Sequence, residues 1–453
     1  MNRVDRMVYH KSMLPGSSQL NPTKMMPVKI NPICHLMVAL MFLNTCAVSA
    51  DEDATVLQTL AQKHRWILEE KVLPYWYRTT VDEAHGGYLL ADPHSGSKDQ
   101  IEKQLVTQSR MIWGFAHAWN KGFRSDSVSY LEAARQGYAF LMDRFYDRTH
   151  GGFYWSTDRS GSVTNDKKLF YGQAFVIYAL VEYYRASGET QAINQAVELF
   201  HTLQKHAYDE EHGGWFEHFE PDWTWIQSPA EGAYVELTGH KSGNAHLHWM
   251  EALAELHEVT QSSEVRRALK ESLEINRRYF YPLDPDASSF HQTPDWQRVS
   301  GGRSDGISYG HNVEFAWLML RAQEVLGEPL DWGHFKAHID HSLRYGFDHQ
   351  RGGIYNLGMP KTKAHDQNKV WWCQSEMVAA LAYAYQGPLT AHVSRPLRQT
   401  VEFLESHMID PKDGIWYSSV SAEGEVLQSG KANVWKGMYH DFRGLMIFES
   451  AVD

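Results

Sequence analysis

The chain has 453 residues, enough for one large domain or two to three ordinary ones, and 13% of them are aromatic. This aromatic content, with 16 tryptophans and 23 tyrosines, is typical of a large core or of an aromatic-lined pocket. The formal net charge is −12, and no block of like charges occurs, which argues against a nucleic-acid-binding surface.

The first 50 residues are predicted to be a leader with a signal peptide. Lys24 and Lys29 precede a mostly apolar stretch, 33–48, and small residues then form a cleavage site at Val48-Ser49-Ala50. The apolar stretch is short and interrupted by polar residues, so no membrane span is predicted. We expect a mature protein that is exported and not membrane-bound. The alternative is a mis-assigned start and a cytoplasmic protein.

The mature chain, residues 51–453, is expected to form a single domain. No linker rich in Pro, Gly or Ser divides it. Its one cysteine, Cys373, excludes an internal disulfide framework.

A turn motif of Gly-Gly or Asp-Gly followed by aromatic residues recurs along this domain. It occurs as HGGYLL at 85, HGGFYW at 150, HGGWFE at 212, RGGIYN at 351 and DGIWYS at 413. The intervals are 65, 62, 139 and 62 residues, and a degenerate sixth turn near Asp284 divides the long one. Gly-Gly supplies the positive φ of a tight turn, and the aromatic residues after it suit a short strand pair. A repeat of about 63 residues is therefore predicted.

Apolar residues at three- and four-residue spacing predict two helices in each repeat. In chain order the predicted helices are Val56–Tyr77, Gln108–Trp119, Tyr130–Phe145, Gln173–Arg185, Ile193–His206, Leu247–Val259, Val265–Tyr279, Val313–Leu326, Trp332–Tyr345, Ser375–Tyr385, Leu397–Met408 and Trp435–Ser450. Six helical hairpins with short β-turn or strand connections predict an all-α fold, the (α/α)6 barrel. An open solenoid is the alternative, but it more often has distinct polar capping repeats.

The second helix of each predicted hairpin opens with a polar residue among aromatic ones. These residues are Arg110, Gln173, His248, His311, Gln374 and His440. Three of the steps between them are 63 residues and the last is 66, whereas the step of 75 to His248 requires an insertion in the loop 221–232. Equivalent positions on the inner helices of a ring converge on its axis, so we expect these side chains to share one cavity.

Two of the histidines are followed by a glutamate three residues later, His248 by Glu251 and His311 by Glu314. Residues at i and i+3 share a helix face, so each carboxylate can orient its imidazole. Histidine has an unperturbed pKa near 6.5 and suits proton transfer near neutrality. The pattern therefore favours acid–base chemistry in an aromatic cavity.

Three other functions are compatible with parts of this pattern. Zinc could bind His246, His248 and His311, but i and i+2 positions on a helix point apart, and no HExxH motif or cysteine cluster is present. A glycoside hydrolase would use a pair among Glu251, Glu314 and Glu376. A non-catalytic sugar-binding ring would leave the repeated His/Glu pairs unexplained. We expect no metal.

The motifs of the second helices resemble the acylglucosamine 2-epimerase superfamily, and most closely its cellobiose 2-epimerases. The matching stretches are QSRMIWGF, KSGNAHLHWMEAL, SYGHNVEFAWLMLRA, KVWWCQSE and WKGMYH, and the similarity runs over about 57–446. The resemblance implies reversible C2 epimerisation of a reducing-end glucose, as in cellobiose or related β-1,4 disaccharides. The product from cellobiose is 4-O-β-D-glucopyranosyl-D-mannose. The reaction passes through ring opening and a cis-enediolate and uses no metal or cofactor; the partner is a small sugar.

The resemblance also implies roles for individual residues. His311 and His440 are the paired acid–bases, one on each face of C2, and His248 and Arg110 stabilise charge at O1 and O2. Glu314 and Glu251 orient the histidines. The residues expected to hold the sugar are Arg110, Asn244, Glu251, Trp372 and Trp435, and the residues expected to be catalytic are His311, His440, His248 and Glu314.

Two departures from the family pattern leave the substrate open. Asn312 stands where the family has an aspartate after the histidine, and Met438 stands where the cellobiose enzymes commonly have proline. A ketose-forming isomerase or a monosaccharide 2-epimerase acting on mannose or N-acylglucosamine is the alternative within the superfamily. An (α/α)6 glycoside hydrolase is a more remote one. The oligomeric state is not predicted.

Overall fold

The computed structural model describes residues 52–90, 102–228 and 236–452. The predicted leader lies outside them. Residues Ala50–Asp453 form one compact unit. Among the described residues, no helix is both long and apolar enough to cross a lipid bilayer.

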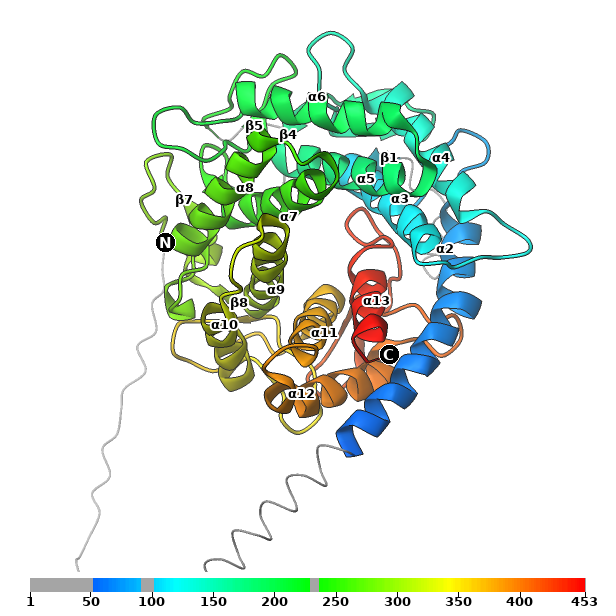
Figure 1. Cartoon of the computed structure of the whole chain (residues 1–453), viewed down its shortest axis with the longest axis vertical. Coiled ribbons are helices and arrows are strands. Elements are labelled where there is room, and N and C mark those ends of the chain that lie inside the picture. The colour runs from blue at the N-terminus through cyan, green and yellow to red at the C-terminus, as the bar shows by residue number, and fades with distance from the viewer. Residues whose placement is uncertain (1–51, 91–101, 229–235, 453) are drawn as a thin grey trace, which may run out of the picture. The chain divides into compact units, whose positions relative to one another are not determined.

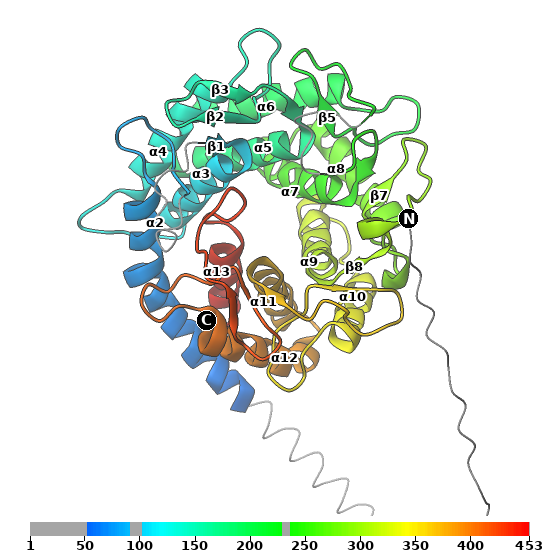
Figure 2. The ribbon, with the colours of Figure 1, turned by 180° about the vertical axis from the view of Figure 1, so that it is seen from behind.

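The unit is a ring of inner helices surrounded by a ring of outer helices (Figures 1 and 2). The inner helices are α3 (Leu105–Asn120), α5 (Phe170–Ser187), α7 (Gly243–Thr260), α9 (Tyr309–Leu326), α11 (Trp371–Tyr385) and α13 (His440–Val452). The outer helices are the segment 52–80, which ends in α2 (Leu73–Thr80), and α4 (Tyr130–Phe140), α6 (Thr190–His206), α8 (Ser263–Ile275), α10 (Trp332–Tyr345) and α12 (Thr390–Phe403). Inner and outer helices alternate along the chain, so the predicted (α/α)6 barrel is confirmed.

Helix burial follows from the distribution of apolar residues. Helix α5 is apolar on nearly every side and is buried continuously from Phe170 to Tyr183, as expected for an inner helix that the ring of outer helices covers. Helix α8 instead buries one stripe, which includes Val265, Ala268 and Leu269, and exposes its charged face. The sequence therefore distinguishes the two rings.

Short π-helical segments adjoin the outer helices, and two short 3-10 segments lie in the connection between α8 and α9. The π segments are η1 (Leu68–Val72), η2 (Leu141–Phe145), η3 (Asn276–Phe280) and η6 (Leu404–Met408), and the 3-10 segments are η4 (Pro285–Ala287) and η5 (Gly302–Asp305). Segment η1 lies within the first outer helix, whereas η2, η3 and η6 extend α4, α8 and α12 at their carboxyl ends. Most predicted helices agree with the structure within a few residues.

The helix predicted over Trp435–Ser450 is wrong at its start, since α13 begins at His440. Asn433 and Lys436 exchange backbone hydrogen bonds at 3.2 Å, which closes a turn just before the helix. This turn presents the Trp435 carbonyl group to the centre of the ring.

Short antiparallel strand pairs lie at the amino-terminal ends of the inner helices. The strands are β1 (Glu102–Gln104), β2 (Ser156–Asp158), β3 (Val163–Asn165), β4 (Lys168–Leu169), β5 (His218–Phe219), β6 (Lys241–Ser242), β7 (His291–Gln292), β8 (Ile307–Ser308), β9 (Leu357–Gly358), β10 (Lys369–Val370), β11 (Ser419–Val420) and β12 (Val426–Gln428). They form the sheets β1-β2-β3, β10-β11-β12, β4-β5, β6-β7 and β8-β9. The pairs β1-β2, β4-β5, β6-β7, β8-β9 and β10-β11 each join one repeat to the next, as in the register Lys168↔Phe219, whereas β2-β3 and β11-β12 are local hairpins.

The Gly-Gly turns have the predicted positive φ, +82° at Gly352 and +79° at Gly353. Each is closed by a single antiparallel bridge, such as Phe347↔Ile354, rather than by a longer strand pair. A glutamine on an inner helix binds the backbone of the residue that follows each of these turns. At Gly352-Gly353, Gln374 Oε1 accepts from Ile354 N at 2.8 Å, and Gln374 Nε2 donates to Ile354 O at 2.6 Å. Gln108 and Gln173 hold the turns at Tyr88 and Phe153 in the same way.

A buried lysine–aspartate pair also recurs at these turns. Lys369 Nζ lies 2.9 Å from Asp348 Oδ2 and donates to the Gly352 carbonyl group at 2.8 Å. The equivalent pairs are Lys103–Asp82, Lys168–Asp147, Lys241–Asp209 and Lys431–Asp410. The strand before α9 carries Ile307 at the lysine position, in the repeat whose turn is degenerate.

Replacing Lys369 with methionine is expected to lower the free energy of unfolding by about 3 kcal/mol, because Asp348 would keep a buried charge without its partner. Urea denaturation followed by circular dichroism measures the change. The double variant Lys369→Met with Asp348→Asn is the control and should recover part of the loss. A single variant as stable as the original protein would contradict a structural role for the repeated pair.

Candidate functional site

A cavity of about 380 Å³ opens at the amino-terminal ends of the inner helices. Its lining residues are Arg110, Tyr171, Glu236, Asn244, His248, His311, Glu314, Trp371, Trp372, Asn433, Trp435 and His440. Every predicted site residue except Glu251 is among them, and Glu251 lies directly against His248. The structure thus brings together the residues expected to share one cavity.

Two members of the predicted repeat position do not face this cavity. Gln173 and Gln374 hold the Gly-Gly turns, and the residues two positions later, Phe175 and Glu376, contact His248 and His440 instead. A shift of two residues turns a side chain by about 200° around a helix. A regular signal was available, because each such glutamine follows its turn partner by 20 residues, as in Gln374 and Ile354.

Glu376, which sequence reasoning assigned only to a hydrolase, orients His440. The His440 Nδ1 atom lies 2.7 Å from Glu376 Oε1, and both side chains are buried. Burial lowers the pKa of His440 to about 3 despite the adjacent carboxylate. Burial alone would raise the pKa of Glu376, but the Arg443 guanidinium and the His440 hydrogen bond outweigh it and lower the pKa to about 2. His440 is therefore a neutral imidazole with its Nδ1 proton directed at a carboxylate.

This pairing predicts a pH dependence of stability. The folded pKa of His440 is depressed from 6.5, so below pH 6.5 the unfolded chain takes up a proton that folded His440 does not. The free energy of unfolding should therefore fall as the pH falls from 6.5 to 4.5. Urea titrations at several pH values should show a smaller slope for His440→Asn in that window, and equal slopes would contradict the assignment.

The predicted pair of His248 and Glu251 is formed. His248 Nδ1 lies 2.8 Å from Glu251 Oε2, and the Tyr439 hydroxyl donates to the same carboxylate at 2.8 Å. Burial lowers the pKa of His248, although the Glu251 carboxylate acts in the opposite direction. The His248 ring also packs at 4.8 Å between centroids against Phe175, so its orientation is fixed on two sides.

His311 is oriented differently from the prediction. Its Nδ1 lies 2.8 Å from the Oγ of Ser308, the residue that caps α9, and Ser308 Oγ also accepts from the backbone N of His311 at 3.4 Å. Glu314 points instead toward Arg443, with Oε1 3.2 Å from Nη2. The i, i+3 spacing did not show that the capping residue Ser308, rather than Glu314, would hydrogen-bond the imidazole ring of His311.

Trp372 lies between the two histidines expected to move protons. Its ring centroid is 4.7 Å from that of His311 and 5.9 Å from that of His440. A sugar carbon beside this indole ring would therefore lie near both imidazoles.

Arg110 is held rigidly at the cavity wall. Its Nη1 donates to the Trp435 carbonyl group at 2.8 Å, and its Nη2 donates to the Tyr171 hydroxyl at 3.0 Å. The guanidinium carbon lies 4.4 Å from the ring centroid of Phe175 and 4.7 Å from that of Tyr439. A planar cation fixed in this way can face negative charge on a ligand without rearranging.

Asn244 lies on the same cavity wall, together with two residues that were not predicted from the sequence, Glu236 and Tyr171. Asn244 Nδ2 donates to Glu236 Oε1 at 3.2 Å, and Glu236 Oε2 lies 2.8 Å from His291 Nε2. Tyr171 was missed as well, although it lies only two residues before Gln173. Asn312 belongs to a different, much smaller cavity with Ser288, Ser289 and Phe290.

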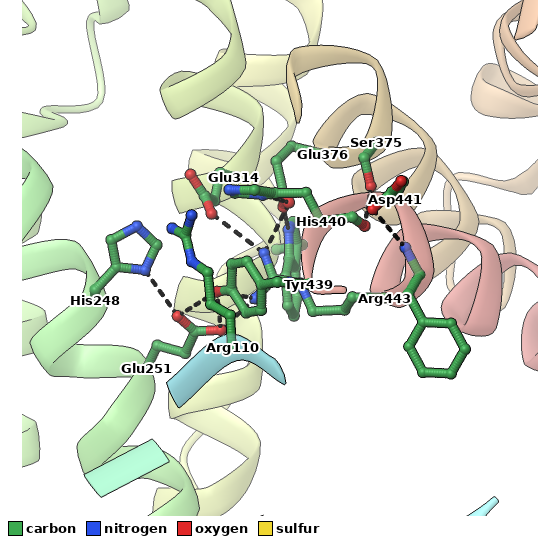
Figure 3. Close-up of polar contacts among 12 residues, drawn as sticks. Arg110, His248, Glu251, Glu314, Ser375, Glu376, Tyr439, His440, Asp441 and Arg443 are labelled. Carbon is green, nitrogen blue, oxygen red and sulfur yellow. Dashed lines mark hydrogen bonds and ion pairs between the residues drawn. The ribbon is translucent and has the colours of Figure 1, made fainter. Parts of the chain in front are cut away.

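Beneath the cavity, Arg443 joins three carboxylates (Figure 3). Its Nη1 donates to Glu251, and its Nη2 donates to Glu376 at 2.8 Å and to Glu314 at 3.2 Å. Arg443 is missing from the predicted site, although it follows His440 by three residues on α13 and shares its face. A further cavity of about 580 Å³ lies at the carboxyl-terminal ends of the inner helices, with Glu251 and Arg443 also in its lining.

Potential metal ligands are already engaged. One ligand atom from each of Glu314, Glu376 and His440 lies within 4.8 Å of the others, but Arg443 donates to both carboxylates. His246, a candidate zinc ligand, directs Nδ1 to the Ser242 carbonyl group and accepts from Trp215 N through Nε2. The donors of this region fit a guanidinium cation better than a metal ion.

The position of the cavity adds electrostatic stabilisation. His311 and His440 lie in the first turns of α9 and α13, where the partial positive charge of each helix amino terminus is concentrated, and Arg110 and His248 lie in the second turns of α3 and α7. An anion formed here meets these dipoles and the Arg110 guanidinium. The arrangement is suited to removing a proton from carbon and stabilising the oxyanion that results.

Comparisons with known proteins agree with this chemistry. Residues 86–443 match the model of the family described as N-acylglucosamine 2-epimerase (GlcNAc 2-epimerase). The chain is 30% identical to a cellobiose 2-epimerase of Ruminococcus albus over 84% of this chain and 95% of that protein, and 28% identical to one of Bacteroides fragilis over 85% and 97%. It is also similar to the structure of cellobiose 2-epimerase from Spirochaeta thermophila, with a TM-score of 0.78, 29% identity and coverage of 88% and 97%.

Proposed function

Because the chain belongs to the N-acylglucosamine 2-epimerase family, we propose that it epimerises C2 of the reducing-end glucose of cellobiose or a related β-1,4 disaccharide. The enzyme is an isomerase of the carbohydrate epimerase class. The observation that carries the proposal is that His311 and His440 both lie close to the Trp372 ring, in a chain whose relatives include cellobiose 2-epimerases.

His311 and His440 transfer the protons in this proposal. After ring opening, one neutral imidazole removes the C2 proton and becomes an imidazolium, and the electron pair forms a cis-enediolate with O1 and O2. The other histidine, in its protonated form, delivers a proton to the opposite face of C2. Glu376 orients His440 and stabilises its charged form, and Ser308 orients His311.

Arg110 and His248 stabilise the enediolate. Arg110 supplies a fixed guanidinium, and the Glu251 hydrogen bond leaves the Nε2 atom of His248 for the sugar. Preorganised donors of this kind contribute several kcal/mol when charge develops in a buried site. We propose that Trp372, Trp435 and Asn244, which line the cavity, hold the sugar rings.

Product identification from a substrate panel tests the substrate. Cellobiose, lactose, mannose and N-acetylglucosamine would each be incubated with the enzyme, and the products separated by anion-exchange chromatography. Conversion of cellobiose to 4-O-β-D-glucopyranosyl-D-mannose supports the proposal. Turnover of monosaccharides alone would replace it with a monosaccharide 2-epimerase.

The same panel decides between epimerisation and isomerisation. Both begin with loss of the C2 proton, and an isomerase returns a proton to C1 and yields a ketose. Asn312, which departs from the family pattern, lies in the smaller cavity with Phe290, so its effect on this choice would be indirect. Ketose as the main product would establish the isomerase.

A further inference from the structure

Three buried carboxylates share one guanidinium below the reaction cavity. Glu251, Glu314 and Glu376 all lie against Arg443, and each of the four side chains is at most 5% exposed. Three negative charges around one positive charge would leave the cluster with a charge of −2 among buried side chains. Ionised groups in such a place are costly unless each is paired and hydrogen-bonded.

The three carboxylates are not held equally. Glu251 receives hydrogen bonds from His248, Tyr439 and Arg443. Glu376 receives them from His440 at 2.7 Å, from Arg443 at 2.8 Å and from the Trp317 indole nitrogen at 3.0 Å.

Glu314 is the weakly held member of this cluster. Its Oε1 accepts from Arg443 at 3.2 Å, and its Oε2 is buried with no hydrogen-bond partner among the described residues. One of its oxygens lies within 4.8 Å of an oxygen of Glu376. Two carboxylates this close rarely ionise together, and the one with fewer donors retains the proton.

We propose that Glu314 is a neutral carboxylic acid in the working enzyme, and that Glu251 and Glu376 are the ionised members of the cluster. Burial and the neighbouring Glu376 charge raise the pKa of Glu314 well above its usual range, whereas Arg443 lowers the pKa of Glu376. Several titratable or charged groups face Glu314 from the other inner helices and their ends. They are Glu251 and His248 on α7, Cys373 and Glu376 on α11, Tyr439 just before α13, His440 and Arg443 on α13, Arg110 on α3 and Tyr171 on α5.

The effect of a neutral Glu314 on catalysis rests on the proposed epimerase reaction, whereas its protonation state does not. With Glu314 neutral, the charges of Glu251 and Glu376 balance those of Arg443 and Arg110. The enediolate then forms beside two imidazoliums, the one that has taken the C2 proton and the one that has not yet given up its own, so the reacting site keeps a net positive charge at the high-energy step. An ionised Glu314 would add a negative charge beside the forming enediolate and oppose it.

Glutamine has the shape of a neutral carboxylic acid, so Glu314→Gln separates the two charge states. We expect this variant to lose at least tenfold less kcat than the two matched variants that follow, because it keeps the charge state proposed for Glu314. The matched variants Glu376→Gln and Glu251→Gln, which remove needed charges, should lose at least 100-fold. Glu314→Asp keeps an ionisable group at altered length and should be less active than Glu314→Gln. A loss for Glu314→Gln as large as that for Glu376→Gln would overturn the proposal.

Two measurements test the protonation without any substrate. Infrared spectra at pH 7 should contain the carbonyl stretch of a buried carboxylic acid, and Glu314→Gln should lack it. Unfolded Glu314 ionises above about pH 4.5 and the folded group does not, so the stability of Glu314→Gln relative to the original protein should rise as pH increases. Absence of both signals would overturn the protonated state even if the enzyme is an epimerase. If both signals are present but the protein is inactive on every sugar, the protonated state of Glu314 is supported and the proposed function is rejected.

Discussion

Replacing His440 with asparagine is expected to lower kcat for epimerisation by about 10³-fold, because a general acid–base group contributes about 10²–10⁴-fold. Asparagine keeps a polar side chain that can accept or donate near Glu376, so the cluster around Arg443 should remain folded. Steady-state kinetics with chromatographic detection of the epimer measures the loss. Circular dichroism and the thermal melting temperature serve as controls for folding.

His440→Asn also allows a test of which face His440 serves. If His311 and His440 act on opposite faces, the variant should still exchange the C2 proton of one epimer with solvent while converting neither epimer to the other. His311→Asn should show the complementary exchange. A His440→Asn enzyme that converts the epimers at more than a tenth of the original rate would contradict the assignment.

Arg443→Met is expected to have the largest effect on stability. It removes the one guanidinium that contacts Glu251, Glu314 and Glu376, and breaking a buried ion pair by removing one partner costs about 3–5 kcal/mol. The free energy of unfolding from urea titration measures the cost. Activity should be lost as well, because His440 and His248 depend on these carboxylates for their orientation.

The matched control is Arg135→Met, which removes an exposed arginine paired with Glu132 three residues away. Exposed pairs contribute about 0–1 kcal/mol, so this variant should be nearly as stable as the original protein. Arg443→Lys keeps a positive charge but not the forked geometry and should lie between the two. If Arg443→Met were no less stable than Arg135→Met, the cluster would not be held together by the guanidinium.

The fold was predictable because its signals are periodic. Gly-Gly turns such as Gly352-Gly353 recur at about 63 residues, and helix α10 has the predicted bounds Trp332–Tyr345. Two helices in each of six repeats favour a closed ring over an open solenoid, and the structure confirms the ring (Figure 1). The amino-terminal positions of His248 and His311 then predict that both line one cavity, as the structure shows.

The contacts around these histidines were less predictable because they depend on side-chain direction. A two-residue error in the repeat placed Gln374 where Glu376 lies, and that error concealed the carboxylate that orients His440. The spacing of His311 and Glu314 is the same as that of His248 and Glu251, but Ser308 takes the role of the glutamate. Sequence spacing cannot show such a choice between two partners that both reach the ring.

Arg443 illustrates a second limit. An arginine among apolar residues of a terminal helix has no repeat partner, so periodicity gave no reason to select it. Its importance arises from three helices that deliver Glu251, Glu314 and Glu376 to one point. Such convergence is a property of the assembled ring and not of any one segment.

Incorporation of deuterium at C2 tests the central claim most directly. Cellobiose would be incubated with the enzyme in D2O and followed by NMR, beside the double variant His311→Asn with His440→Asn. We predict that the mannose-terminated product and recovered cellobiose both gain deuterium at C2, and that the double variant gives neither product nor exchange. Absence of C2 exchange with the original enzyme, or equal exchange with the double variant, would contradict two-histidine proton transfer in this cavity.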